Sequence, residues 1–269
     1  MRIAKIFIFV VIATLGWQIS AIGQQRIVTD GLVSYWTFDR ADTEGDTAKD
    51  VWGNNDGTIV GGAKTVNGKI GEALEFNGVD QYVDVGHPAD GSLDFGADGD
   101  FTIAAWINVS EIPPDQYTIV SKGDRGSSPR ILFKIRSEQA YITLANENGG
   151  GPKPDFASNA VVVDGEWHYV ALVVDRSNAT KIYIDGVMDS EGMAAEGTDV
   201  NTGSPLHIGK SHQDGNAARR FFNGLIDEVT IYNKALSDAE MEQNFAAEGL
   251  SVEPTGKLAL TWGMVKVSD

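Results

Sequence analysis

The 269-residue sequence contains no cysteine, which excludes disulfide bonds, thiolate metal sites and a lipidated N-terminal cysteine. Basic residues are also scarce: 21 Lys and Arg stand against 38 Asp and Glu, and the formal net charge is −17. A surface of this sign repels phosphate backbones and anionic membranes, so we expect no nucleic-acid or lipid-surface partner. Two interpretations of the acidity stay open: a well-solvated surface, or a protein that meets divalent cations outside the cell.

Long apolar runs are missing, except for IFIFVVIATLGW near the N-terminus. Arg2 and Lys5 precede this run, and the small residues of Ala21-Ile22-Gly23 follow it, as in a secretory signal peptide. We therefore predict a signal peptide over residues 1–23 and a secreted protein, extracellular or periplasmic, that does not insert into a membrane after cleavage. The remaining length fits one all-β domain over 24–250 and a tail over 251–269 that holds one more strand-like run.

Short alternating or apolar segments recur between turn clusters rich in Gly, Asp and Asn, a pattern that predicts β-strands. The expected strands cover residues 32–38, 72–76, 81–85, 101–109, 117–122, 130–135, 140–145, 159–163, 167–175, 181–190, 206–210 and 225–232. Strands at this spacing indicate a sandwich or barrel rather than a βαβ fold.

Two local units have clear signatures. One helix is predicted over residues 235–249, where Ser237 and Glu240 match a capping box and Gly249 is expected as the C′ residue. Residues 176–180 separate two strand-like runs and predict an antiparallel hairpin, with Asp185-Gly186 as a tight bend or bulge in its second run.

The apolar segment FNGLIDEVTIYN, residues 222–233, carries two adjacent acids. Neighbouring side chains on a regular strand face opposite ways, so we expect Asp227 to share a face with Val229 and Ile231, and Glu228 to share one with Ile226. A carboxylate among such residues has to be hydrogen-bonded, paired or bound to a metal.

The order of several segments resembles the LamG-like jelly-roll family of the concanavalin A-like lectin/glucanase superfamily. These segments are LVSYWTFD, DVWGNNDGTIVGGA, GKIGEALEFNGVDQYVDVG, FTIAAWIN, IVSKGD, DGEWHYVALVVD, KIYIDG, HIGK and FNGLIDEVTIYNKALSDAE. The resemblance covers roughly residues 30 to 248. It implies a two-sheet antiparallel jelly-roll sandwich with one short C-terminal helix and with the first and last strands side by side. It does not imply one activity, because such folds host lectins, adhesion modules and glycosidases.

Glycoside hydrolysis needs two carboxylates across the scissile bond, and the glucanases of this superfamily carry theirs as E-x-D-x-E on one strand. No such spacing occurs in a strand setting here: Asp94, Asp98 and Asp100 lie in a Gly-rich loop, and Asp227 and Glu228 are adjacent. The four histidines are scattered and none follows a nucleophile motif. We therefore predict no catalytic residues and no enzyme activity.

The resemblance also implies a structural calcium ion at the edge of the sandwich, and calcium prefers hard oxygen ligands from loops. The predicted ligands are Asp39, Asp50, Asn55 and Asp227. In the alternative, residues 54–57 are a turn of residues that tolerate left-handed backbone angles, and Asp227 binds loop amides. Under both interpretations Asp227 ties the last strand to the entry loop, residues 49–58, and is not a catalytic acid.

Ligand-binding candidates lie in long polar loops, where a sandwich collects its binding residues. Trp52 could stack on a sugar ring, and Arg125, Arg130 and Arg219 could bind a uronate, a sulfate or an acidic partner. The plainer alternatives are that Trp52 shelters its loop and that the arginines pair with nearby carboxylates.

Together these patterns predict a secreted, non-catalytic recognition module that binds a carbohydrate or another extracellular partner. The alternatives are a surface or matrix adhesion protein that binds proteins, and a divergent glycoside hydrolase.

Overall fold

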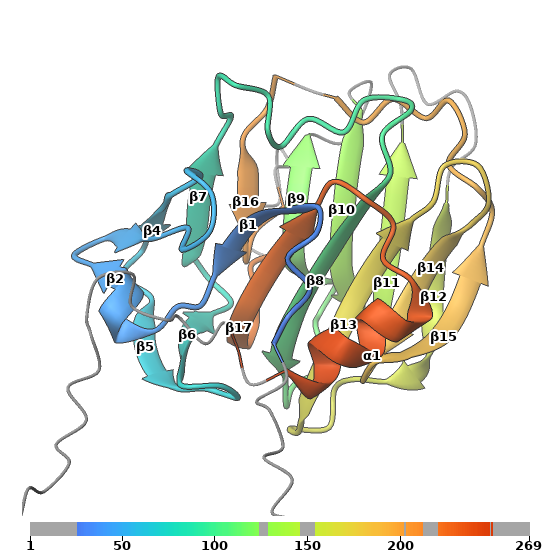
Figure 1. The fold of residues 1–269 in the computed structure, drawn as a ribbon. Helices are drawn as coiled ribbons and strands as arrows, with labels where there is room; N and C mark the ends of the chain where they lie inside the picture. Colours follow the sequence, from blue (N-terminus) through green and yellow to red (C-terminus); the bar gives the residue numbers. More distant parts are fainter. Residues whose placement is uncertain are drawn as a thin grey trace, which may run out of the picture.

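The computed structural model describes residues 26–123, 129–145, 154–201, 203–211, 220–247 and 249. The predicted signal peptide and the tail over 251–269 lie outside the described residues. Two antiparallel sheets lie one behind the other, and a single described helix, α1 (Asp238–Ala246), covers the front of one of them (Figure 1). The predicted two-sheet jelly-roll sandwich with a short C-terminal helix is confirmed.

The first sheet has eight strands and contains both ends of the domain. Its order is β15 (Val187–Gly192), β14 (Thr180–Ile184), β13 (Trp167–Val174), β8 (Phe101–Asn108), β17 (Asn223–Tyr232), β6 (Glu72–Asn77) and β5 (Lys64–Asn67). The first strand, β1 (Leu32–Trp36), pairs with β17. The expectation that the first and last strands lie side by side is therefore confirmed.

The second sheet has nine strands. Its order is β12 (Asp155–Val161), β11 (Gln139–Ala145), β10 (Arg130–Arg136), β9 (Tyr117–Gly123), β16 (Leu206–Ile208), β7 (Tyr82–Gly86), β4 (Gly57–Val60), β3 (Thr47–Ala48) and β2 (Thr43–Glu44). A 3₁₀ turn, η1 (Arg40–Asp42), precedes β2. The short strands β2 to β5 are missing from the sequence prediction, because runs of two to four residues show too little alternation to be recognised.

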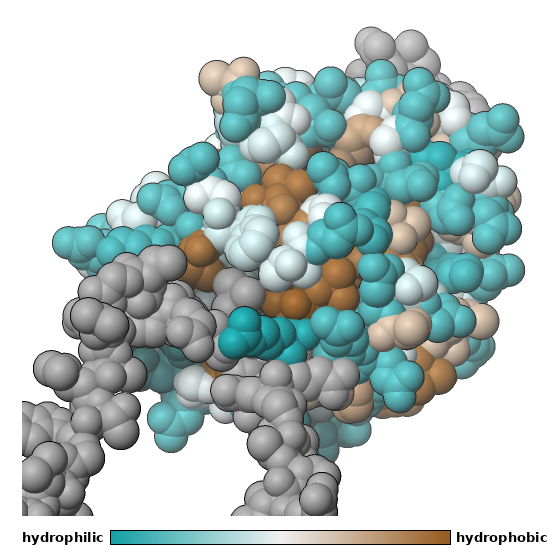
Figure 2. Space-filling view, in the orientation of Figure 1, coloured by the Kyte–Doolittle hydropathy of each residue, from teal (hydrophilic) through white to brown (hydrophobic). Residues whose placement is uncertain are grey.

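Alternate residues of the strands fill the space between the sheets. Ile103 and Ile107 of β8 and Phe133 of β10 belong to this core and are fully buried. The other face of β8 is also buried, because Ala104 and Trp106 pack in an outer cluster beneath α1. The surface on the α1 side is mostly hydrophilic, with hydrophobic residues in patches between (Figure 2), as on a water-exposed protein face.

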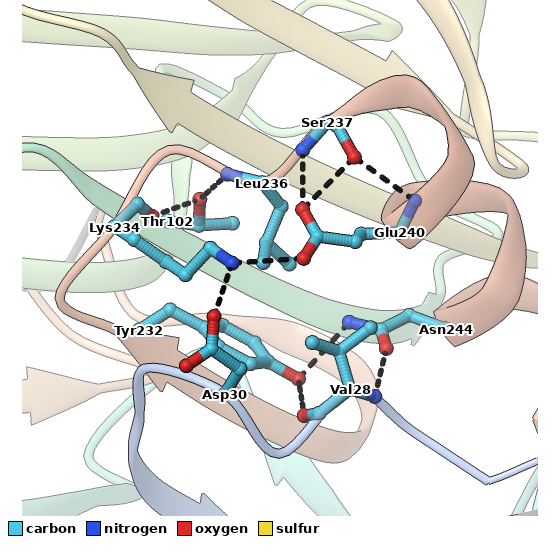
Figure 3. A network of polar contacts seen from close by, with 9 residues as sticks. All are labelled: Val28, Asp30, Thr102, Tyr232, Lys234, Leu236, Ser237, Glu240 and Asn244. Atoms are coloured by element: carbon cyan, nitrogen blue, oxygen red, sulfur yellow. Dashed lines mark hydrogen bonds and ion pairs between the residues drawn. The ribbon is translucent and has the colours of Figure 1, made fainter.

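Polar contacts dock α1 onto the eight-stranded sheet (Figure 3). The side-chain amide of Asn244 accepts a bond from the Val28 N–H (2.7 Å) and donates one to the Tyr232 hydroxyl (3.0 Å). Lys234 forms ion pairs with Asp30 (2.7 Å) and Glu240 (2.8 Å). These contacts join the two ends of the domain to the sheet.

The predicted capping box of α1 is present, with Ser237 and Glu240 bonded reciprocally. The predicted C′ role of Gly249 is wrong. The helix ends at Ala246, and Ala247 is already extended with ψ 144°. The chain therefore leaves the helix before a left-handed glycine is needed.

Asp185-Gly186 forms a complete reversal, where the sequence predicted a bend or bulge within one run. Both residues have positive φ, 52° and 80°, as the two central residues of a type I′ hairpin turn require. The predicted strand over 181–190 is therefore two strands, β14 and β15.

A β-bulge at Asp227 and Glu228 changes which residues of β17 face the core. Asp227 pairs with Trp106, the register shifts before the next pair, and Glu228 has φ 53°. The extra residue reverses the alternation beyond it, so Ile226 and Val229 both lie in the inter-sheet core. The expectation that Asp227 shares a face with Val229, and Glu228 with Ile226, is wrong.

Both acids lie on the outer face of the sheet. Asp227 pairs with Trp106 of the outer cluster. A Cβ built at Gly249 would lie 3.6 Å from the hydroxyl of the outer-face residue Tyr35 and 3.8 Å from Glu228 Oε2, so Glu228 lies on the same side of the sheet as Tyr35. Asp227 is 0% exposed and Glu228 is 5% exposed, so the two carboxyl groups do not open into a groove.

Candidate ligand-binding site

Strand β10 carries cations on one face only. Its sequence, RILFKIR, alternates, and Ile131, Phe133 and Ile135 point into the core. Arg130 and Lys134 therefore lie on the outer face of the nine-stranded sheet, as does the strand's last residue, Arg136.

Lys134 is buried at the centre of this face. Its side chain is held by a short chain of hydrogen bonds: the ammonium donates to Thr143 Oγ1 (3.0 Å), and Thr143 donates to Asp155 Oδ1 (2.7 Å). The ammonium also stands 4.8 Å from the ring centre of Tyr141. Burial lowers the pKa of Lys134 to about 8, because desolvation penalises the charged form.

The side chains around Lys134 enclose a cavity of about 210 Å³, which we call the cationic pocket. It is lined by Asp115, Gln116, Arg130, Leu132, Lys134, Arg136, Thr143, Asp155 and Arg220. Arg220 reaches it from the segment before β17 and pairs with Asp115 at 3.2 Å. Donors and acceptors from five separate parts of the chain thus converge on one hollow.

Among the described residues, one of the four predicted ligand-binding residues lies in the cationic pocket. Arg130 lines the cationic pocket. Trp52 is 44% exposed but is not among the lining residues, and its indole N–H donates to the Leu32 carbonyl (2.9 Å). Arg125 and Arg219 lie outside the described residues. The sequence analysis missed Lys134 and Arg136, although the period-2 alternation of residues 130–136 was a signal that could have found them.

Two of the four predicted calcium ligands meet at the β5–β6 turn. Asp227 Oδ2 accepts bonds from the amides of Lys69 (2.9 Å) and Ile70 (3.0 Å), and Asp39 Oδ1 accepts one from Glu72 (2.6 Å). Gly68 permits this approach, since a Cβ there would lie 2.6 Å from Asp227 Oδ2. The loop that Asp227 anchors is therefore the β5–β6 turn, and not the entry loop at residues 49–58.

The other two predicted ligands organise the entry loop itself. Asp50 Oδ1 accepts from the amides of Tyr35 (2.9 Å) and Gly53 (2.9 Å), and its Oδ2 accepts from Asn55 (3.0 Å). The Asn55 side-chain amide donates to Ser34 Oγ (2.7 Å). These bonds hold the entry loop through side chains. The expectation of left-handed backbone angles over residues 54–57 is wrong, because none of these residues has a positive φ and Gly57 already belongs to β4.

No group of three or more His, Asp or Glu side chains that could hold a metal ion occurs among the described residues. Asp39, Asp50 and Asp227 thus do not form one carboxylate cluster. Burial, together with a smaller contribution from the negative charge of Asp39, raises the pKa of Asp227 to about 7. Burial likewise raises the pKa of Glu228 to about 8.

A family model described as the concanavalin A-like lectin/glucanases superfamily matches residues 77–242. The chain belongs to this superfamily. The matched segment contains every residue that lines the cationic pocket, so the pocket is part of the superfamily domain. A comparison with curated protein sequences found no match.

Solved structures with low sequence identity share the fold of this superfamily member. The binding domain of Paraclostridial Mosquitocidal Protein 1 has a TM-score of 0.64 at 20% identity, over 80% of this chain and 52% of that one. Domain 4 of AbnA, a GH43 extracellular arabinanase from Geobacillus stearothermophilus solved in complex with arabinotriose, has a TM-score of 0.58 at 22% identity, over 80% and 98%. Trypanosoma rangeli sialidase in complex with sialic acid has a TM-score of 0.57 at 18% identity, over 82% and 33%.

The chain spans about half of the mosquitocidal binding domain and a third of the sialidase. In the described ranges, no helix has the length and apolar character needed to cross a membrane.

Proposed function

We propose that this superfamily member is a secreted recognition module that binds carbohydrate in the cationic pocket without cleaving it. The observation that carries the proposal is the pocket itself, where charged and polar side chains from β10, β11 and β12 meet in one hollow on the outer face of a sheet. Lys134, Thr143 and Asp155 are already bonded to one another, so little side-chain entropy is lost when a ligand binds.

The comparisons support this proposal. The superfamily includes lectins, and one structure of the same fold is an arabinanase domain in complex with arabinotriose. Absence of catalysis is part of the proposal because Asp227 and Glu228, two carboxyl groups with raised pKa, are buried away from solvent.

A glycan array followed by calorimetry tests the binding function. We expect the wild-type protein to bind one class of glycan and to release no reducing sugar from it. Arg130→Ala should weaken binding at least tenfold, since a charged hydrogen bond contributes about 1.5–3 kcal/mol. The matched control is Arg40→Ala, an exposed arginine outside the pocket that pairs with Glu72, and it should bind like the wild type. A silent array with capture of a protein partner would favour the adhesion alternative, and turnover of a glycan would favour the hydrolase.

We also propose a structural calcium ion at the β5–β6 turn, with Asp39 and Asp227 as its carboxylate ligands. Asp227 Oδ1 is buried and has no hydrogen-bond partner in the described part of the chain, so one hard oxygen is left for a cation. Asp50 and Asn55 fit this role less well, because backbone and side-chain partners already occupy the carboxylate of Asp50 and the amide of Asn55.

A melting experiment checks the calcium proposal. EDTA should lower the melting temperature of the wild type, since a ligand that binds only the folded state stabilises it. Asp227→Asn should remove this sensitivity, whereas Asp50→Asn should keep it. Identical melting curves with calcium and with EDTA would contradict the proposal.

A further inference from the structure

We infer that the ligand of the cationic pocket is an acidic sugar, a hydroxylated ring that carries a carboxylate or a sulfate ester. This inference rests on the proposed carbohydrate-binding function and specifies its ligand. The charge balance of the pocket, its unpartnered donor and its size support it separately.

The pocket is positive within an acidic protein. Four cationic side chains line it against two carboxylates, whereas the whole chain has a net charge of −17. One carboxylate, Asp115, is paired with Arg220, and the other, Asp155, accepts a hydrogen bond from Thr143 and partly offsets the charge of Lys134. The pocket therefore concentrates positive charge where the rest of the protein would repel an anion. At physiological ionic strength, exposed carboxylates more than about 8 Å from the pocket are screened, so they repel an anion bound in the pocket only weakly.

Lys134 is a buried cation that gains from a bound anion. It is only 6% exposed, and the positive charges of Arg130, Arg136 and Arg220 further disfavour its charged form. The groups that face it from other strands are Tyr141 of β11 and Asp155 of β12. An anion placed among these cations would offset both the desolvation of Lys134 and the repulsion between the cations.

Gln116 supplies a donor that nothing in the described structure uses. The residue is 6% exposed and lines the pocket, and its amide nitrogen is buried without a hydrogen-bond partner among the described residues. A buried donor without a partner costs about 1–3 kcal/mol, so this group favours a ligand that brings an acceptor. An anionic oxygen is such an acceptor.

The acceptors and the volume indicate a sugar rather than a simple ion. Asp115 and Asp155 lie on the pocket wall, where their oxygens can accept bonds from hydroxyl groups. A volume of about 210 Å³ corresponds to roughly seven water molecules in the liquid, which is close to the size of one sugar ring. Leu132 adds an apolar contact for a ring face.

Calorimetry with three matched ligands tests the inference: a galactose oligomer, the corresponding galacturonic acid oligomer and a 6-sulfated galactose oligomer. We expect at least one anionic oligomer to bind the wild type at least tenfold more tightly than the neutral one. The ratio of the dissociation constants of the two anionic oligomers shows whether the pocket prefers a carboxylate or a sulfate ester. Lys134→Met should lose most of this preference, while Arg40→Ala should keep it.

The pH dependence provides a second readout. Both anionic oligomers keep their charge between pH 7 and 9.5, so loss of the Lys134 proton should weaken wild-type binding several-fold across this range. The groups that oppose Lys134 are the carboxylates of Asp115 and Asp155, and Tyr141 also faces it, with a pKa that burial raises. Lys134→Arg should bind at pH 7 and lose the pH dependence. If that variant does not fold, the flat pH profile of Lys134→Met gives the same information.

Equal binding of neutral and anionic oligomers, still weakened at least tenfold by Arg130→Ala, would overturn the acidic-sugar inference and leave the proposed function intact. Absence of binding to every glycan on the array would overturn both.

Discussion

Arg176→Met is expected to lower the free energy of unfolding by about 4 kcal/mol, measured by urea denaturation. The Arg176 guanidinium is buried and donates hydrogen bonds to four backbone carbonyls: Gly96 (2.8 Å), Gly99 (3.0 Å), Ala195 (3.0 Å) and Thr198. Methionine fills a similar volume but leaves these carbonyls without their donors. Burial of the guanidinium charge costs free energy, which is why the pKa of Arg176 is lowered. Removal of that charge offsets only part of the free energy lost with the four hydrogen bonds.

The position of Arg176 explains why one side chain matters so much. Arg176 is the second residue after β13 and binds two segments, residues 96–99 and 195–198, that are not joined to it by sheet pairing. Arg176→Lys should be intermediate, because an ammonium keeps the charge but cannot match the planar fork of donors. The exposed Arg40→Met is the control and should stay within about 0.5 kcal/mol of the wild type. If Arg176→Met lowered the free energy of unfolding by less than about 1 kcal/mol, Arg176 would not be what holds these two segments.

Asp227→Ala is expected to cost about 3 kcal/mol when measured in EDTA, which isolates the protein's own contacts from any effect of calcium. The substitution removes the two bonds that tie the β5–β6 turn to β17, those from the amides of Lys69 and Ile70. The side chain is completely buried, so water does not replace the lost acceptor.

Asp227→Asn separates the hydrogen-bond acceptor of the Asp227 side chain from its negative charge. Its side-chain oxygen still accepts from the turn, so we expect a loss of only about 1 kcal/mol. Asp46→Ala, at an exposed position before β3, serves as the control and should have little effect. If Asp227→Ala were as stable as the wild type, Asp227 would not be an anchor at all.

Much of the fold was predictable because it depends on neighbouring residues. Alternation placed the strands of five or more residues, apart from β14 and β15, to within a few residues, and Ser237 with Glu240 located the start of α1. The strand predictions failed where a bulge or a tight turn interrupted the alternation of inward and outward side chains. The bulge at Glu228 reversed the alternation of β17, and the two left-handed residues at Asp185-Gly186 cut one expected strand into two.

The candidate site was less predictable than the fold. Arg130 was identified from its charge, but Lys134 stood in an apolar run and was assigned only to a strand. Its partners, Thr143 and Asp155, lie on the next two strands and meet it only through strand pairing. Asp227 was correctly singled out as a buried acid that needed partners, yet the turn that supplies them is more than 150 residues away in the chain.

The sequence by itself determined the β-sandwich class, the superfamily, the acidic surface and the helix cap. These follow from composition and from contacts between residues close in the chain, whose geometry is nearly the same in every protein. Only the tertiary structure decided which cations share a pocket, which amides Asp227 holds and what Arg176 clamps. The reason is that strand register and bulges set the distances between segments far apart in sequence, and no local pattern fixes that register.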